Sequence, residues 1–484
     1  MEAFEVTVEV HLSGGLPSFT LSGLPAAAVR ESRDRVRAAL QTLGMPVPPR
    51  RITAHLGPAD IPKEGGRFDL AISLGLLKAD RNPDWKTDEI EFLGELSLNG
   101  ELRPVQGALP AVLAARDAGR AVVVPQANAA EASLVGDSVI YSAHDLADVI
   151  AHLDGREQLS RVNPSEATSA PDCGPDLADV RGQRVAKRAL TIAAAGGHNM
   201  LMIGPPGAGK SMLAQRLSGL LPALRIEEIL EVASIASVAG RPVDEIATTQ
   251  RPFRSPHHSA SSAALVGGGS NPRPGEISLA HHGVLFLDEL PEFRRTALEA
   301  LREPLESGVV TISRANATAC FPAAFQLIAA MNPCPCGFLG DGSDRCHCPE
   351  TRVRSYRSTL SGPLLDRVDL HVALERVPIA GISKFVPDCT SAAVASEVSR
   401  ARDHQLDLRG CLNARLDDRR LWRELEIGHD ARRLLDRAAD RWHLSARSCT
   451  RILKVARTIA DLESAPNPSA EHIAEAIQLR CLDR

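Results

Sequence analysis

The chain of 484 residues lacks an excess of positive charge and any long apolar run. Its 55 basic residues are outnumbered by 60 acidic ones, which gives a formal net charge of −5. This balance excludes a protein that coats nucleic acid through bulk positive charge. No stretch approaches the roughly 20 apolar residues of a membrane span, and the acidic start of the chain lacks the basic segment of a secretory signal. We therefore expect a cytoplasmic protein without a membrane partner.

Hydrophobic residues make up 44% of the chain and charged residues 24%, which is typical of a globular protein. The length predicts about two to four domains. Residues 1–150 mix strand-like and helical patterns, and residues 151–176 form a linker rich in proline and glycine. Residues 177–385 alternate strands and helices, and residues 392–484 are arginine-rich and helical by period. The fold class that we expect is α/β.

Short apolar runs in the first block predict strands at Glu5–Leu12, Ile52–Leu56 and Ala121–Pro125. Helical patterns cover Ala26–Leu43 and Ala108–Ala118. In the second block, apolar runs occur at Met200–Ile203, Val284–Leu287 and Gln326–Ala330. Such continuous runs are typical of buried parallel strands.

A phosphate loop of the pattern G-x-x-x-x-G-K-[ST] follows the strand at Met200–Ile203 and opens a helical stretch at Met212–Leu221. Lysine is scarce, with seven in the chain, and one of them stands in this motif. Its Lys210 is expected to reach the β- and γ-phosphates of ATP, and the Ser211 hydroxyl is expected to ligate Mg²⁺. The predicted nucleotide-binding residues of the loop are Gly204, Pro205, Pro206, Gly207, Ala208, Gly209, Lys210 and Ser211.

Polar residues follow the next two apolar strands. Asp288 and Glu289 directly follow the apolar run Val284–Leu287. We expect Asp288 to hold Mg²⁺ and Glu289 to deprotonate the attacking water. Asn332 ends the following strand and has the amide that positions such a water; the alternative is an ordinary loop asparagine. Together these residues predict ATP hydrolysis.

Six motifs in combination carry a family resemblance. They are Asp179–Gln183, the phosphate loop, Arg254–His258, Val284–Glu289, Met331–Gly337 and Ser361–Asp369. Together they resemble the magnesium-chelatase-like AAA+ ATPases, and among them the ComM (YifB) branch of competence proteins. The resemblance implies a ring, usually a hexamer, that binds ATP between subunits.

Two arginines gain roles from this resemblance. Arg367 falls on the arginine-finger position, which implies contact with a neighbour's γ-phosphate; the alternative is a surface arginine paired with Asp366 or Asp369. Arg447 matches the second sensor arginine of the helical lid, although Arg451 stands one turn further along the same helix face.

Two insertions mark the subgroup. Residues 251–275 resemble the helix-two insert of chelatases and MCM helicases, and the roles of His257 and His258 within it stay open. Residues Val309–Phe321 predict a hairpin. The resemblance implies that Arg314, near its tip, grips DNA phosphates in the pore of the ring; the alternative is an ordinary turn arginine.

Four cysteines stand close together in two C-x-C pairs, which is enough for a tetrahedral Zn²⁺ site. The spacing is not the common C-x-x-C, and His347 is a competing ligand. Free thiols or a redox pair are the alternatives to structural zinc. The predicted ligands are Cys334, Cys336, Cys346 and Cys348.

The N-terminal block resembles the α+β domain of Lon-type proteases, of the S5-domain-2-like type. Arg67 stands at the position of the catalytic serine and Leu109 at that of the lysine. Because neither nucleophile nor base is present, we expect the fold to be retained and the proteolysis to be lost.

The ATPase is therefore expected to be a ring motor on branched or single-stranded DNA, with branch migration in recombination as its task and recombination proteins as candidate partners. A remodelling subunit that loads Mg²⁺ into a tetrapyrrole is the main alternative, and a nucleotide switch without hydrolysis is a third. Rates of ATP hydrolysis with and without DNA separate these hypotheses.

Overall fold

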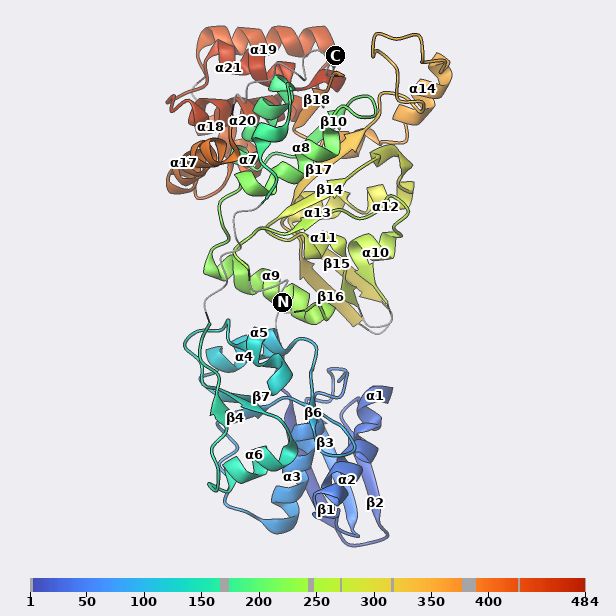
Figure 1. Cartoon of the computed structure of the whole chain (residues 1–484), viewed down its shortest axis with the longest axis vertical. Helices are drawn as coiled ribbons and strands as arrows, with labels where there is room; N and C mark the ends of the chain where they lie inside the picture. Colours follow the sequence, from blue (N-terminus) through green and yellow to red (C-terminus); the bar gives the residue numbers. More distant parts are fainter. Residues whose placement is uncertain are drawn as a thin grey trace. The chain divides into compact units, whose positions relative to one another are not determined.

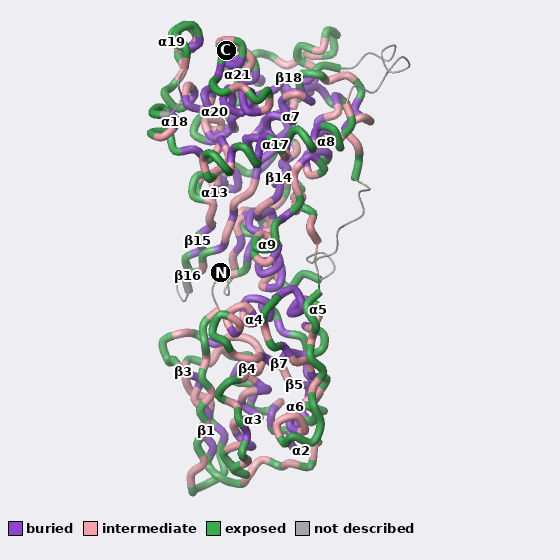
Figure 2. The backbone as a smooth tube through the Cα atoms, turned by 90° about the vertical axis from the view of Figure 1, so that its left-hand side faces the viewer, coloured by how far each residue is buried: buried purple, intermediate pink, exposed green. Residues whose placement is uncertain are grey.

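The computed structural model describes residues 3–165, 174–242, 248–269, 272–314, 317–376, 389–424 and 427–483. They form two compact units, which Figure 1 colours along the chain. The first unit comprises Met1–Ser169 together with Ile226–Thr249, and the second comprises Ala170–Arg225 together with Gln250–Arg484. Each unit has its own buried core (Figure 2). Among the described helices, none is long and apolar enough to cross a membrane.

Two sheets and a short strand pair organise the first unit. The strands are β1 (Thr7–Ser13), β2 (Ser18–Ser22), β3 (Arg51–Gly57), β4 (Ile90–Phe92), β5 (Glu95–Leu96), β6 (Leu102–Arg103), β7 (Ala121–Pro125), β8 (Ile140–Ala143) and β9 (Ser160–Arg161). In the first sheet β3 lies between β1, which is antiparallel to it, and β2, which is parallel. The second sheet has the order β4-β7-β8-β9, and β9 runs antiparallel to β8. All three strands predicted for this block are present.

Helices cover these sheets. They are α1 (Ala27–Arg30), α2 (Ser32–Thr42), α3 (Asp69–Arg81), α4 (Ala108–Asp117), α5 (Ala129–Ala132) and α6 (Leu146–Leu153), with the 3-10 turn η1 (Gln126–Asn128). The helix predicted over Ala26–Leu43 is divided at Glu31. Helix α3 lies close to β1 at Gly75, where an added Cβ would stand 2.9 Å from the Val10 side chain. The absence of a side chain at Gly75 therefore permits the close contact between this helix and the sheet.

Helix α9 (Ile226–Ala239) belongs to the first unit, although it follows the phosphate loop in sequence. Its Ala233 is buried in one cluster with Leu109 and Val112 of α4. The Gly107 N–H at the start of α4 donates to the Ser237 carbonyl at 3.1 Å. The chain thus leaves the second unit after residue 225 and returns to it at residue 250.

A five-stranded parallel sheet forms the centre of the second unit. Its strands are β10 (Met200–Ile203), β11 (Phe253–Arg254), β14 (Val284–Leu287), β17 (Gln326–Met331) and β18 (Leu370–Ala373). The spatial order is β11-β14-β17-β10-β18, and each adjacent pair is parallel. Every residue of β10, β14 and β17 is buried, as their continuous apolar runs predict.

Helices pack on the sheet and form the C-terminal region of this unit (Figure 1). They are α7 (Arg184–Gly196), α8 (Lys210–Arg216), α17 (Ser391–Arg409), α18 (Asp418–Glu424), α19 (His429–Trp442), α20 (Ala446–Leu462) and α21 (Ala470–Gln478), with the 3-10 turns η2 (Leu177–Asp179), η3 (Ser218–Leu220), η6 (Asn413–Arg415) and η7 (Cys481–Asp483). Apolar residues of α20 share one core cluster with those of α7 and β10. The C-terminal helices and the sheet therefore belong to one compact unit and share a core.

The two predicted insertions also have structure. The first contains α10 (Ser262–Val266) and the pair β12 (Gly267–Gly268) and β13 (Arg273–Pro274), and α11 (Glu276–Leu279) follows it. The second is the antiparallel hairpin of β15 (Val309–Arg314) and β16 (Ala317–Pro322), which follows α13 (Arg302–Ser307). The remaining elements are η5 (Leu290–Glu292), α12 (Arg295–Glu299), α14 (Glu350–Arg357) and α15 (Gly362–Leu365).

Candidate nucleotide-binding site

The phosphate loop connects the end of β10 to the start of α8 at Lys210. Gly209 has φ +92°, a left-handed conformation that glycine adopts without strain. A Cβ at Gly204 would lie 2.7 Å from the Leu374 carbonyl oxygen, so this position also requires glycine. The backbone can therefore wrap around an anion at the N-terminus of α8, where the helix dipole favours negative charge.

Lys210 lies inside the loop and is 9% exposed. Its Nζ donates to the Gly204 carbonyl at 2.6 Å, to the Pro205 carbonyl at 3.1 Å and to Asn332 Oδ1 at 3.0 Å. Burial lowers the pKa of Lys210, and the carboxylates of Asp288 and Glu289 oppose that shift. The ammonium group is thus held by two carbonyls of the loop itself and by the amide oxygen of Asn332, which follows β17.

The two halves of the predicted magnesium site meet. Ser211 Oγ donates to Asp288 Oδ2 at 2.6 Å. This contact follows from the sheet order, because β17 lies between β14 and β10 and the carboxyl ends of parallel strands meet at one edge. Asn332 follows β17 at the same edge. A hydroxyl, a carboxylate and an amide therefore converge beside the phosphate loop, and oxygen ligands of this kind suit Mg²⁺.

Glu289 has a partner that sequence reasoning missed. The residue has φ +52°, and its side chain is half exposed. Its Oε2 lies 3.2 Å from Nδ1 of His258, whose role the sequence left open. The neighbouring His257 ring is tilted by 34° against the His258 ring, with centroids 4.0 Å apart, and its Nδ1 pairs with the Ser259 hydroxyl instead. The first insertion therefore touches the expected catalytic carboxylate.

A group of arginines lies at the other edge of the sheet. Arg367 precedes β18, and its carbonyl accepts a hydrogen bond from Asn199, which precedes β10. The four residues of β10 separate this edge from the phosphate loop by about 13 Å, at about 3.3 Å per residue. The arginines and the phosphate loop of one chain therefore do not surround the same nucleotide.

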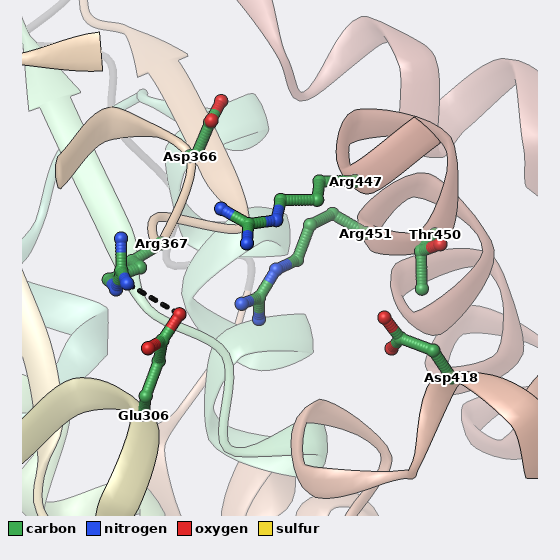
Figure 3. A pocket seen from close by; sticks show the side chains of 7 residues that line it. All are labelled: Glu306, Asp366, Arg367, Asp418, Arg447, Thr450 and Arg451. Carbon is green, nitrogen blue, oxygen red and sulfur yellow. Dashed lines mark ion pairs between the residues drawn. The ribbon is translucent and has the colours of Figure 1, made fainter. Parts of the chain in front are cut away.

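A pocket at this edge brings both predicted arginines together (Figure 3). Its lining residues are Glu306, Asp366, Arg367, Asp418, Arg447, Thr450 and Arg451.

Arg367 is buried and pairs with Glu306 at 2.5 Å. The alternative pairing of Arg367 with Asp366 or Asp369 is not found. The Asp366 carboxylate points away from Arg367 in Figure 3, and Asp369 forms an ion pair with Arg451 at 2.8 Å instead. Arg447 is exposed, and within the described residues it makes no hydrogen bond or ion pair. Of the two α20 arginines that line the pocket, Arg447 is therefore the one that is free to meet a ligand.

The hairpin predicted at Val309–Phe321 is present, with six paired positions from Val309–Pro322 to Arg314–Ala317. Arg314 is the last residue of β15, next to the turn. Its backbone therefore stands near the hairpin tip, while its side chain and residues 315–316 lie outside the described part of the chain.

The four clustered cysteines converge in space. Their sulfur atoms all lie within 4.8 Å of one another, and three of the separations are 3.3, 3.8 and 3.7 Å. Ligands of a tetrahedral zinc ion, at about 2.3 Å from the metal, stand about 3.8 Å apart. The Phe338 N–H and the Cys334 thiol lower the pKa of Cys336 to about 7, whereas burial and the Cys336 thiol raise the pKa of Cys346 to about 11. The donor set fits a structural Zn²⁺.

The parallel sheet, the phosphate loop, the acidic and amide residues at one edge and the helical lid define an AAA+ ATPase. The family described as magnesium chelatase, subunit ChlI, matches residues 176–382. The related descriptions subunit ChlI of Mg-chelatase and magnesium chelatase, subunit ChlI C-terminal match residues 8–128 and 388–480.

Individual relatives narrow this class. The chain is 48% identical to the competence protein ComM of Haemophilus influenzae, over 99% of this chain and 95% of ComM. It is 47% identical to YifB of Escherichia coli, over 99% and 94% of the two chains. A likeness of 24% to the maternal DNA replication licensing factor mcm6 of Xenopus tropicalis spans 42% of this chain and 25% of that protein. The chain therefore belongs to the magnesium-chelatase-like family of AAA+ proteins that contains ComM and YifB.

Proposed function

We propose that this protein is an ATP-driven ring motor that acts on DNA and drives branch migration in recombination during natural transformation. The observation that carries the motor is the separation of Arg367 and Arg447 from the phosphate loop of their own chain. A site that needs both parts is complete only between two copies, so the nucleotide would bind between subunits of a homo-oligomer, with a hexamer expected from the family.

The residues then have distinct roles. Lys210 holds the β- and γ-phosphates, and Ser211 and Asp288 hold Mg²⁺, which neutralises phosphate charge when it is bound. Glu289 takes the proton of the attacking water, and Asn332 orients that water. Arg367 and Arg447 of the neighbouring copy stabilise the charge that develops on the γ-phosphate.

The name of ComM as a competence protein and the hairpin β15–β16 support DNA as the partner. Six copies of Arg314 around a pore would give a ring of positive charge although the chain as a whole is acidic. The cysteine cluster would hold a structural zinc that fixes the loop after β17. The first unit would be a Lon-like domain without proteolysis, since Arg67 and the buried Leu109 replace the serine and lysine.

The test is the rate of ATP hydrolysis by the full chain without DNA, with single-stranded DNA and with a four-way junction. We expect DNA to raise the rate several-fold and R314A to lose that stimulation while it keeps the basal rate. R314K retains the positive charge and should keep most of the stimulation by DNA. E289Q should bind ATP without hydrolysing it. Full stimulation of R314A would contradict the role of Arg314.

Tetrapyrrole metallation is the second candidate, because the matching family descriptions name a magnesium-chelatase subunit. An ATPase rate that is indifferent to every DNA tested would favour this candidate over the DNA motor.

A further inference from the structure

Arg367 is enclosed by acceptors from its own chain. Its side chain is 9% exposed, and its Nη2 contacts Glu306 Oε1 at 2.5 Å. Its Nη1 donates to the Pro363 carbonyl at 2.6 Å, and its buried Nε has no hydrogen-bond partner among the described atoms. Both terminal nitrogens of the guanidinium are therefore engaged. An arginine grips a phosphate best through two parallel N–H donors, so Arg367 must exchange an existing partner before it can do so.

Glu306 is the partner that can leave. Its side chain is 56% exposed, in contrast to the buried arginine, so water can solvate the carboxylate after it turns away. The hydrogen bond from Arg367 lowers the pKa of Glu306, which keeps the carboxylate ionised near neutral pH. The exposed carboxylate regains its hydration when the pair opens, whereas the buried guanidinium of Arg367 needs a new counter-ion. A phosphate dianion from a neighbouring subunit would serve as that counter-ion.

The position of Glu306 in the chain connects it to the hairpin. It lies in the last turn of α13, and only Ser307 and Gly308 separate it from β15. Gly308 has φ +71°, and its carbonyl accepts a hydrogen bond from Ala323, just beyond β16, at 2.7 Å. A shift of the hairpin β15–β16 would therefore reach the end of α13 through Ser307 and Gly308, the two residues that join Glu306 to β15.

We propose that Glu306 is a positioning residue that restrains Arg367 until the hairpin β15–β16 is engaged. In the unengaged chain, Glu306 holds the guanidinium within its own subunit. Displacement of the hairpin moves the end of α13, separates the carboxylate from Arg367 and delivers the arginine to the neighbour's γ-phosphate. The proposal rests on the motor function above, because it assumes that Arg367 acts on a nucleotide held by another copy.

The opposite possibility is that Glu306 orients Arg367 for catalysis. The two roles predict opposite signs, since a restraint slows basal hydrolysis whereas an orienting contact accelerates it. Glu303 provides the control, because it is exposed on the same helix and its carboxylate makes no ion pair in the part of the chain that the structure describes.

The experiment compares DNA-free and DNA-stimulated ATPase rates of the full chain for wild type, E306Q, E303Q, R367A and E306Q/R367A. We expect E306Q to raise the basal kcat about two- to fivefold and to reduce the stimulation by DNA by a similar factor. E303Q should match wild type. The double variant should be as slow as R367A, because the effect of Glu306 runs through that arginine.

A basal rate of E306Q at or below that of wild type, at an unchanged unfolding midpoint, would overturn the restraint in favour of the orienting role. If E306Q folds poorly, E306D tests the same release, since it keeps the charge but shortens the reach. A wild-type ATPase that ignores DNA would contradict the motor function, whereas the basal rates would still decide whether Glu306 restrains Arg367.

Discussion

At the scale of single residues, Asp369 connects the arginine-finger segment to the lid. It is fully buried, and it bonds Arg451 of α20 at 2.8 Å and the Asn199 N–H at 2.9 Å. His198 lies 3.6 Å from the same carboxylate. Burial by itself would raise the pKa of Asp369, but Arg451, His198 and the Asn199 N–H together hold it well below its usual range. This carboxylate is therefore ionised in the folded protein.

We expect D369N to lower the free energy of unfolding by about 3 kcal/mol at pH 7, because Arg451 loses its buried counter-ion. A depressed carboxyl pKa stabilises the fold above the pKa of the unfolded chain, about 3.9, and this contribution is lost as the pH falls further. The difference between wild type and D369N should therefore be full near pH 6 and shrink below about pH 4. Urea unfolding at several pH values measures it. D366N is the matched control, and an equal loss in both variants would contradict the role of Asp369.

Residues in a local motif were predictable, and residues that act through distant partners were not. The phosphate loop, Asp288 and Asn332 could be assigned because each follows an apolar strand whose end places it at the shared edge. The contact of His258 with Glu289 depends on the path of the first insertion, and the contact of Glu306 with Arg367 depends on how α13 packs near the segment before β18. No sequence period reports that path.

At the scale of elements, the cysteine loop after β17 lies against the phosphate loop. A Cβ at Gly337 would stand 2.7 Å from Pro206, so the two loops are in close contact. The four thiols supply a complete tetrahedral set, which leaves no open coordination position for catalysis. A metal here would stiffen a wall of the nucleotide site.

We expect about one equivalent of zinc per chain and its loss in C334S, because three thiolates and water bind the ion less tightly. Removal of the metal should also weaken ATP binding, through the contact between Gly337 and Pro206. Elemental analysis and nucleotide titration measure the two effects. C320S, which changes an exposed cysteine on β16, should retain the metal. Wild-type protein without zinc after metal-replete expression would remove the site.

Three of the five strands of the central sheet were predictable from the sequence because they are continuous apolar runs. The edge strand β11 has two residues and carries no such signal. The assignment of helix α9 to the first unit could not be predicted either, because its apolar pattern indicates a buried face but not the unit that covers this face.

At the scale of the whole molecule, the stability of the first unit depends on α9. Ala233 is completely buried in the cluster that joins this helix to α4. A carboxylate at this position would be buried without a partner. We expect A233D to lower the free energy of unfolding of the first unit by about 3 kcal/mol or more.

Differential scanning calorimetry measures this loss. E227A, which changes an exposed residue on the same helix, should behave like wild type. An unchanged unfolding profile of A233D would show that α9 contributes little to the first unit.

The place of α9 in the first unit also determines whether a protease can separate the two units. The polypeptide passes between the two units at the segment from residue 165 to 174, again at residue 225 and once more at residue 250. Hydrolysis of a single peptide bond between residues 166 and 173 would yield two fragments by electrophoresis under denaturing conditions. In native buffer the fragments would co-elute, because the C-terminal fragment carries a helix that is part of the N-terminal fragment's core.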